Sequence, residues 1–126
     1  MKSRKQIERL FRQGRSFTLS AFKVFYTIDP VSEKEEFAPL KAGVTVSTRN
    51  FKKAVDRNRI KRLLRESIRL QKSSLEQQMI EKKLSLQFFI IFTGRKLPDF
   101  VFVKEKTDAI LQKLAATANE NHTIHT

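Results

Sequence analysis

The stretch from Lys52 to Glu66, KKAVDRNRIKRLLRE, gathers side chains that could bind a polyanion. It contains seven basic residues and two acidic ones. Its apolar residues Ile60, Leu63 and Leu64 recur at helical spacing, which predicts a helix over 55–72 that buries one face. Arginine suits phosphate binding in such a helix, because its planar guanidinium matches the geometry of phosphate oxygens.

The charged residues of this helix surround its apolar face in a defined order. Steps of about 100° per residue place Ile60, Leu63, Leu64, Ser67 and Ile68 in one arc. The opposite side carries Asn58, Arg62, Arg65 and Arg69, while the flanks carry Arg57 and Lys61 on one edge and Arg59 on the other. The apolar arc is predicted to pack on the rest of the fold and to leave the basic residues exposed.

A solvated surface helix is the ordinary explanation of such a charge run. Two observations argue against it here. Asp56 and Glu66 are too few to balance the basic residues by pairs one helical turn apart. Cations in the first turns also oppose the helix dipole, at a cost of about 0.3–1 kcal/mol each. We therefore favour a polyanion-binding role for this helix.

The charge of the whole chain supports that interpretation. The formal charge is +13 over 126 residues. Residues 1–23 carry seven basic and one acidic residue, and residues 41–72 carry eleven and two, whereas residues 73–126 carry seven and six. A balance this positive predicts nucleic acid as the partner before an anionic membrane.

The sequence shows no group of residues typical of an active site. The chain has no cysteine, which excludes disulfides, zinc fingers and thiol catalysis. No paired Asp/Glu cluster typical of two-metal chemistry is present. His122 and His125 lie in a polar tail without further ligands. We predict no catalytic residue and no metal ligand in this chain, and no apolar run approaches the roughly 18 residues of a membrane span.

Two segments ahead of the basic helix are predicted to belong to the fold. SRKQIERLFRQG at 3–14 is typical of a short helix, with Ile7, Leu10 and Phe11 on one face. AFKVFYTI at 21–28 is predicted to be a strand that places Phe22, Val24, Tyr26 and Ile28 on one face.

The remaining segments complete an α+β pattern. A second strand is predicted at 42–47, a further helical piece at 73–84, a buried strand at 86–94 and a terminal helix at 103–118. We predict a two-layer α/β sandwich with a single mixed sheet in the order α-β-β-(β)-α-β-α, the bracketed strand being optional. The first two predicted strands could pair directly. We expect one RNA-binding domain over 1–118 and a frayed tail over 119–126.

The segment AVDRNRIKRLLRE resembles the RNR motif of the bacterial ribonuclease P protein component. That protein assists a catalytic RNA in removing 5′ leaders from precursor tRNAs. RLFRQGRSF, FKVFYT and AGVTVS precede the motif in the family's order and spacing, and the apolar strand and terminal helix follow it. The resemblance covers roughly residues 4–118, and the Arg-Asn-Arg-x-Lys-Arg core in that setting is highly specific.

The resemblance implies that the basic helix lies against the catalytic RNA and that the sheet and first helix form a cleft for the single-stranded leader. It also implies a left-handed crossover. The RNA-binding residues expected on these grounds and on the charge pattern are Lys53, Arg57, Asn58, Arg59, Lys61, Arg62, Arg65 and Arg69. The expected cleft residues are Phe11 and Tyr26, with Ile7 at the position of a second family aromatic. The linker TRNFKK is one residue longer than is usual in the family.

The assembly implied by the resemblance is a ribonucleoprotein endonuclease in the cytoplasm. Catalysis is expected from the RNA subunit and from Mg²⁺ held by the assembly of RNA, protein and precursor tRNA, not by this chain alone. One protein per RNA is expected, and self-association is left open. No membrane partner is expected.

Three alternatives remain from the sequence alone. A ribosomal type of structured-RNA-binding protein would share the charge pattern without a catalytic partner. A membrane-binding or calmodulin-binding basic helix would need an accessible apolar face. A double-stranded DNA-binding protein would be expected to show a motif such as a helix-turn-helix, which we do not recognise here.

Overall fold

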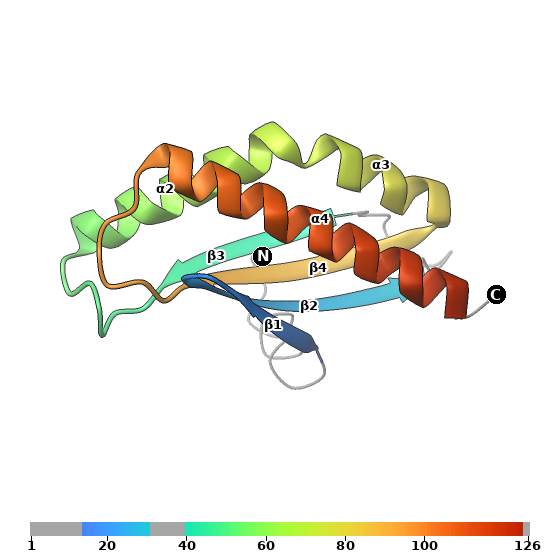
Figure 1. Cartoon of the computed structure of the whole chain (residues 1–126), viewed down its shortest axis with the longest axis horizontal. Helices are drawn as coiled ribbons and strands as arrows, with labels where there is room; N and C mark the ends of the chain where they lie inside the picture. Colours follow the sequence, from blue (N-terminus) through green and yellow to red (C-terminus); the bar gives the residue numbers. More distant parts are fainter. Residues whose placement is uncertain (1–13, 31–39, 125–126) are drawn as a thin grey trace.

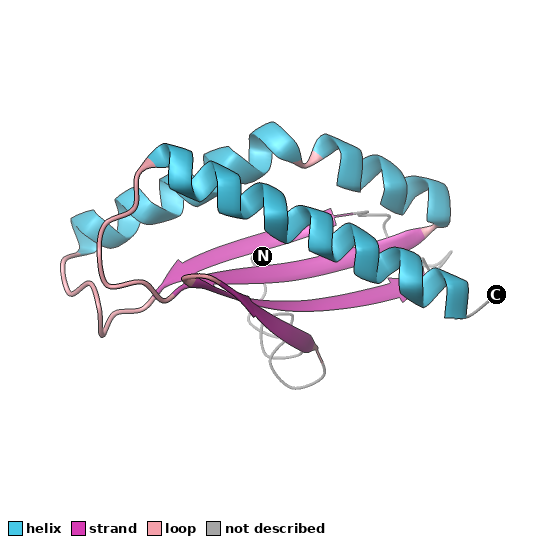
Figure 2. Cartoon of the chain, in the orientation of Figure 1, coloured by secondary structure: helices cyan, strands magenta, loops and turns pink. Residues whose placement is uncertain are grey.

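The computed structural model describes residues 14–30 and 40–124, without the side chains of residues 119–124. Its elements are β1 (Arg15–Leu19), β2 (Phe22–Pro30), β3 (Leu40–Val46), α2 (Ala54–Gln71), α3 (Ser73–Lys82), β4 (Leu84–Phe92) and α4 (Phe100–Ile124). Within the described residues, the helices lie on one side of a single mixed sheet (Figures 1 and 2). The predicted α/β sandwich is confirmed. The helix predicted at 3–14, with Ile7 and Phe11, lies outside the described residues apart from Gly14.

The strand order is β1-β2-β4-β3, so β4 occupies an interior position. It pairs antiparallel with β2 and parallel with β3, and Phe88 stands opposite Tyr26 on one side and Ala42 on the other. The prediction that the strands now labelled β2 and β3 pair directly is therefore wrong. The physical reason lies in the sequence of β4, LSLQFFIIF, whose apolar residues fall on both faces and favour an interior strand.

Strand β1 is a third strand ahead of the basic helix, but it precedes the two predicted strands, whereas the optional strand of the predicted order followed them. It lies at the opposite edge of the sheet from β3. It forms a hairpin with β2 in which Leu19 stands opposite Phe22. Ser20 in the turn has a φ of 51°. Tight hairpin turns usually use Asn or Gly for such left-handed backbone. Without either residue, and with a strand of only five residues, the sequence offers little signal of this hairpin.

The core lies between the sheet and the helices. Alternate residues of the strands face the helix layer. Phe22 and Val24 of β2, which were predicted to share a face, are fully buried there. The other fully buried large side chains among the described residues are Leu86, Phe88, Ile90 and Phe92 of β4, Ile60 and Leu64 of α2, Met79 of α3, and Ile110 and Leu114 of α4. Burying a side chain such as Leu64 contributes about 1.5–3 kcal/mol. The apolar arc of the basic helix is therefore what fixes α2 on the sheet.

The helices and β4 match their predicted positions with small shifts. The basic helix was predicted at 55–72 and runs Ala54–Gln71, and the helical piece predicted at 73–84 is α3. The terminal helix is longer than predicted, since it begins at Phe100 and continues to Ile124. The crossover from β3 through α2 and α3 to the parallel strand β4 is confirmed. Its left-handed course stays a prediction from the resemblance.

Candidate RNA interface

The outer side of α2 displays the residues that the sequence predicted to be exposed. Asn58, Arg59, Arg62, Arg65 and Arg69 are exposed, and Arg57 and Lys61 are half-buried. On the opposite side, Ile60 and Leu64 have no exposed surface and Ile68 has 6%. The helix is therefore amphipathic in the predicted sense. Its apolar face is occupied by the core, which argues against a helix that inserts into a membrane or into calmodulin.

One shallow depression on α2 brings together residues from successive turns. It is lined by Asn58, Arg62, Arg65, Glu66 and Arg69. We call Asn58, Arg62, Arg65 and Arg69 the basic face of α2. Three guanidinium groups along a rigid helix can donate hydrogen bonds to several phosphate oxygens, and the amide of Asn58 can donate or accept beside them. This arrangement suits an extended anionic backbone.

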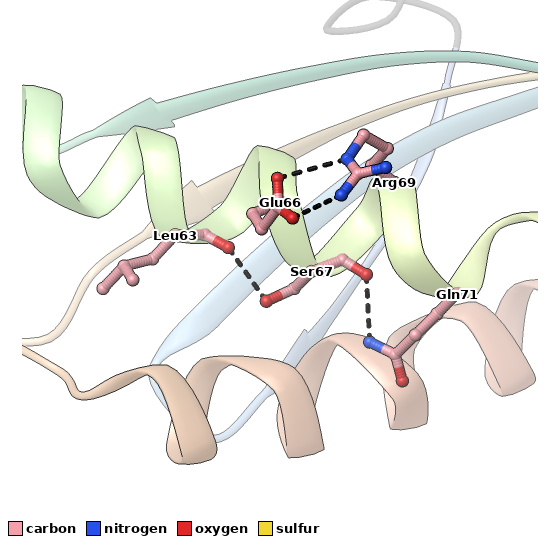
Figure 3. A network of polar contacts seen from close by, with 5 residues as sticks. All are labelled: Leu63, Glu66, Ser67, Arg69 and Gln71. Atoms are coloured by element: carbon pink, nitrogen blue, oxygen red, sulfur yellow. Dashed lines mark hydrogen bonds and ion pairs between the residues drawn. The ribbon is translucent and has the colours of Figure 1, made fainter.

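Glu66 lies within the basic face and pairs with Arg69. The Nε of Arg69 donates to Glu66 Oε2 at 3.2 Å and its Nη2 to Oε1 at 2.5 Å (Figure 3). The hydrogen bond from Arg69 lowers the pKa of the Glu66 carboxyl, and the same bond raises the pKa of Arg69. Because the pair is exposed to solvent, its effect on stability is small. Its main consequence is to offset one of the positive charges available to a polyanion.

Polar side chains on the side of α2 that faces α4 form hydrogen bonds within α2, and one of them also reaches α4. Ser67 is fully buried, and its Oγ donates to the carbonyl oxygen of Leu63 at 2.8 Å (Figure 3). The Nε2 of Gln71 donates to the carbonyl oxygens of Ser67 at 3.1 Å and of Lys104 at 3.2 Å. The last contact joins the end of α2 to the first turns of α4. A hydrogen bond between α2 and α4 thus adds to the apolar packing that orients the basic face.

A groove between α2 and β3 extends the basic surface. It has a volume of about 200 Å³ and is lined by Ala42, Gly43, Val44, Phe89, Ile68, Arg65, Arg69 and Lys72. Arg65 and Arg69 border both this groove and the depression, so the two hollows share a wall. Lys72 was not among the predicted site residues, although it closes the charged block of residues 41–72. Its position one residue after α2 is the signal that could have identified it.

The start of α2 contains two further predicted residues in different settings. Lys53 precedes the first turn and, within the described residues, its side chain forms no capping hydrogen bond. Arg57 points back to the preceding linker, where its Nη1 donates to the carbonyl oxygens of Phe51 and Lys52, both at 2.8 Å. Arg57 is therefore already engaged with the backbone, whereas Lys53 is exposed to solvent.

Tyr26 is the one predicted cleft residue within the described part of the chain. Only 8% of it is exposed, and it belongs to the core cluster on the helix side of the sheet. Its ring packs against that of Phe17 with centroids 5.9 Å apart. Phe11 and Ile7 lie outside the described residues, so the leader cleft stays a prediction.

The described residues contain no group of three or more His, Asp or Glu side chains that could hold a metal ion. None of the described helices is long and apolar enough to cross a membrane.

The fold and the basic face together define an α/β-sandwich protein with a surface suited to a polyanion. The family model described as ribonuclease P matches residues 1–115. The chain belongs to the ribonuclease P protein family. As a member it is the protein subunit of an endoribonuclease ribonucleoprotein that acts in tRNA processing.

Curated relatives agree with the family assignment. The ribonuclease P protein component of Porphyromonas gingivalis strain W83 is 30% identical over 112 residues, which are 89% of this chain and 80% of the relative. The component of Bacillus velezensis is 31% identical over 114 residues, which are 90% of this chain and 84% of the relative.

Solved structures agree on the fold. The RNase P protein of Staphylococcus aureus superposes with a TM-score of 0.66 at 21% identity, covering 90% of this chain and 93% of that one. The RNase P protein of Thermotoga maritima gives a TM-score of 0.66 at 21% identity, covering 90% and 94%.

Proposed function

We propose that this protein binds the catalytic RNA of ribonuclease P through the basic face of α2 and thereby promotes removal of the 5′ leader from precursor tRNA. The observation that carries the proposal is the basic face itself. Arg62, Arg65 and Arg69 line one depression with Asn58, on a helix whose other side is buried in the core. Family membership supplies the identity of the RNA.

The physical basis of binding is neutralisation of phosphate charge. Each phosphate contact by Arg or Lys releases condensed counterions and contributes about 0.7–0.9 to the slope of log affinity against log salt. Such contacts position the RNA without reading its sequence. The shape of the RNA and the fixed orientation of α2 then set which RNA surface fits.

The chemistry in this proposal belongs to the RNA subunit. Mg²⁺ would be held by the assembly of RNA, protein and precursor tRNA, and the described residues offer no cluster suited to it alone. The protein would bind as one copy per RNA in the cytoplasm, where bacterial tRNA precursors are made.

The leader is proposed to run through a cleft that includes Phe11, Ile7 and Tyr26. Aromatic side chains stack on unpaired bases with about 1–3 kcal/mol per base. Tyr26 exposes 8% of its surface, so its ring would have to gain exposure before a base could stack on it. The proposal therefore assigns Tyr26 a place in the wall of the cleft.

The test is a cleavage assay at low Mg²⁺ with the purified protein, its cognate ribonuclease P RNA and a 5′-extended precursor tRNA. We expect a marked rise in cleavage at the mature 5′ end. The matched control is the Arg62→Ala/Arg65→Ala protein, which should fold normally and give a smaller rise. Tight RNA binding without any rise in cleavage would contradict the proposal and leave a general structured-RNA-binding protein.

A further inference from the structure

The linker between β3 and α2 is anchored to the core by Phe51. Phe51 in its middle is 7% exposed, and its ring packs against that of Phe92 with centroids 6.0 Å apart. The N–H of Phe51 donates to the carbonyl oxygen of Ser47 at 3.2 Å. The linker therefore has its own anchor in the core.

Asn50 connects this linker to a second loop. Its Nδ2 donates to the carbonyl oxygens of Thr93 at 3.0 Å and Gly94 at 3.3 Å, which join residues more than forty positions apart. Thr93 in turn donates through its N–H and its Oγ1 to the carbonyl oxygen of Ala21 at 2.8 Å and 3.1 Å. Hydrogen bonds thus connect the β1–β2 turn, the β3–α2 linker and the loop between β4 and α4 at one end of the sheet.

Gly94 allows the second loop to pass close to the core. A Cβ at this position would lie 2.5 Å from Cζ of Phe92, closer than real Cβ contacts occur. The same Phe92 ring contacts Phe51. The β3–α2 linker and the loop after β4 therefore both pack against the ring of Phe92. The hydrogen bonds of Asn50 add a polar connection between the same two loops.

Arg57 connects the linker to the first turn of α2. One of its terminal nitrogens donates to the carbonyl oxygens of Phe51 and Lys52 at 2.8 Å. Both hydrogens of that nitrogen are then used inside the protein. We call Asn50, Phe51 and Arg57 the linker brace, because together they tie the linker to the loop after β4, to the core and to α2.

Four exposed cations outside the basic face of α2 follow the joined segments in sequence. Lys52 and Lys53 follow Asn50 and Phe51, while Arg95 and Lys96 follow Gly94, and all four are exposed. The two loops leave the sheet at the same end, where β3 and β4 stop (Figure 1). The nearby carboxylate of Asp99 is engaged, since it accepts the N–H of Phe102 at 2.8 Å. The hydrogen bonds from Asn50 to Thr93 and Gly94 join the two loops only a few residues from each pair of cations. Like charges on neighbouring loops repel one another, so their own chemistry would not keep the two loops together.

We infer that Asn50 and Arg57 are positioning residues that hold Lys52, Lys53, Arg95 and Lys96 as one preorganised surface for RNA phosphates. The inference rests on the proposed RNA-binding function and deepens it. It assigns to Arg57, the first arginine of the RNR motif, a role that acts through the linker instead of through phosphate contact. Ordering long side chains and loops weakens binding, so a surface ordered before binding gains affinity without gaining charge.

The test compares salt dependence among single variants. Asn50→Ala removes no charge and should weaken binding to ribonuclease P RNA about fivefold with an unchanged salt slope. Hydrogen exchange at the amides of Phe51 and Thr93, which donate to the carbonyl oxygens of Ser47 and Ala21, should become faster in that variant. Arg59→Ala should instead lower the slope by about 0.7–0.9, because Arg59 is an exposed cation outside the linker brace. Gln77→Ala on α3 is the neutral control and should change neither quantity.

Arg57→Ala decides between positioning and contact. The positioning role predicts weaker binding with a slope change clearly smaller than that of Arg59→Ala. An equal slope change would show that Arg57 contacts phosphate and would overturn its assignment. The role of Asn50 would be overturned if Asn50→Ala loosened both loops and kept wild-type affinity, or if it lost affinity without loosening them. Failure of the wild-type protein to bind the RNA would instead refute the proposed function.

Discussion

Helices α2 and α4 occupy the same layer of the fold, but α2 is strongly basic and α4 has balanced charges. Both pack on the same side of the sheet and bury residues in the same core. In sequence, α2 carries six basic and two acidic residues, whereas α4 carries three of each. α4 begins after Asp99, whose carboxylate accepts a backbone N–H of the first turn. α2 begins after Lys53, which provides no such cap within the described residues.

This difference shows that packing does not require the charge of α2. α4 packs in the same layer with balanced charges and with Asp99 as its cap. The arginines of α2 oppose the helix dipole, and Lys53 stands where a capping residue would stabilise the helix, so neither feature serves stability. Sites that break local stability rules consistently are expected to serve function. The following predictions separate the two contributions.

The largest effect is expected from charge placed on the buried side of α2. Leu64 has no exposed surface, so Leu64→Asp should destabilise the fold by at least about 4 kcal/mol through lost burial and an uncompensated carboxylate. Denaturant unfolding measures the loss. Leu70→Asp, at a position that is 49% exposed on the same helix, is the control and should remain folded. A native-like Leu64→Asp protein would contradict the assigned apolar face.

Removing charge from the outer side should affect binding and spare the fold. Arg62→Ala/Arg65→Ala should weaken RNA binding roughly 25-fold or more at 0.1 M salt, because each lost contact lowers the salt slope by about 0.7–0.9. Filter binding across a salt series measures both quantities. The melting temperature should stay within a degree or so of wild type. Lys104→Ala on α4 should leave the slope unchanged, and an equal drop there would show that charge acts without regard to position.

Exchanging the cap of α2 should separate stability from binding. Lys53 has φ −81° and ψ 126°, a conformation that suits a capping serine. Lys53→Ser should therefore stabilise the fold by about 1 kcal/mol and weaken RNA binding. Asp99→Ala at the start of α4 is the converse variant, expected to lose about 1 kcal/mol of folding stability without weakening RNA binding. Unchanged RNA affinity in Lys53→Ser would exclude Lys53 from the interface.

The smallest effect should come from the acid within the basic face. Glu66→Gln releases Arg69 from its ion pair and should tighten RNA binding, with a salt slope steeper by up to about 0.9. Glu105→Gln on α4 adds the same net charge away from the basic face and should change the slope much less. Weaker binding by Glu66→Gln would mean that Glu66 orients Arg69 for its contact with RNA.

The sequence was most informative where one local pattern decided the outcome. The helical recurrence of Ile60, Leu64 and Ile68 predicted both the extent of α2 and its buried side. The apolar run around Phe88 and Ile90 predicted a buried strand. The hairpin and the strand order were harder, because the pairing of β2 with β4 depends on residues some sixty positions apart, and no local pattern encodes that choice.

Some residues of the candidate site could be predicted from local spacing, whereas others depend on the tertiary fold. The exposure of Arg62 and Arg65 follows from helical geometry and was predicted correctly. The engagement of Arg57 depends on the path of the linker, and the position of Lys72 beside β3 depends on how α2 lies across the sheet. Neither can be deduced from spacing along one helix. The burial of Tyr26 follows from the face of β2 that meets the helices, which alternation alone leaves undecided.

The interior place of β4 has a consequence for the growing chain on the ribosome. β2 and β3 share no partner except β4, and β4 is the last strand to be synthesised. Until it emerges, the pairing open to the described strands is the β1–β2 hairpin, which is marginally stable by itself. The arginines of α2 therefore leave the exit tunnel before the surface that orients them exists. During that interval the nascent chain is a flexible polycation beside ribosomal RNA, and completion of one apolar strand turns it into a protein with a defined RNA-facing side.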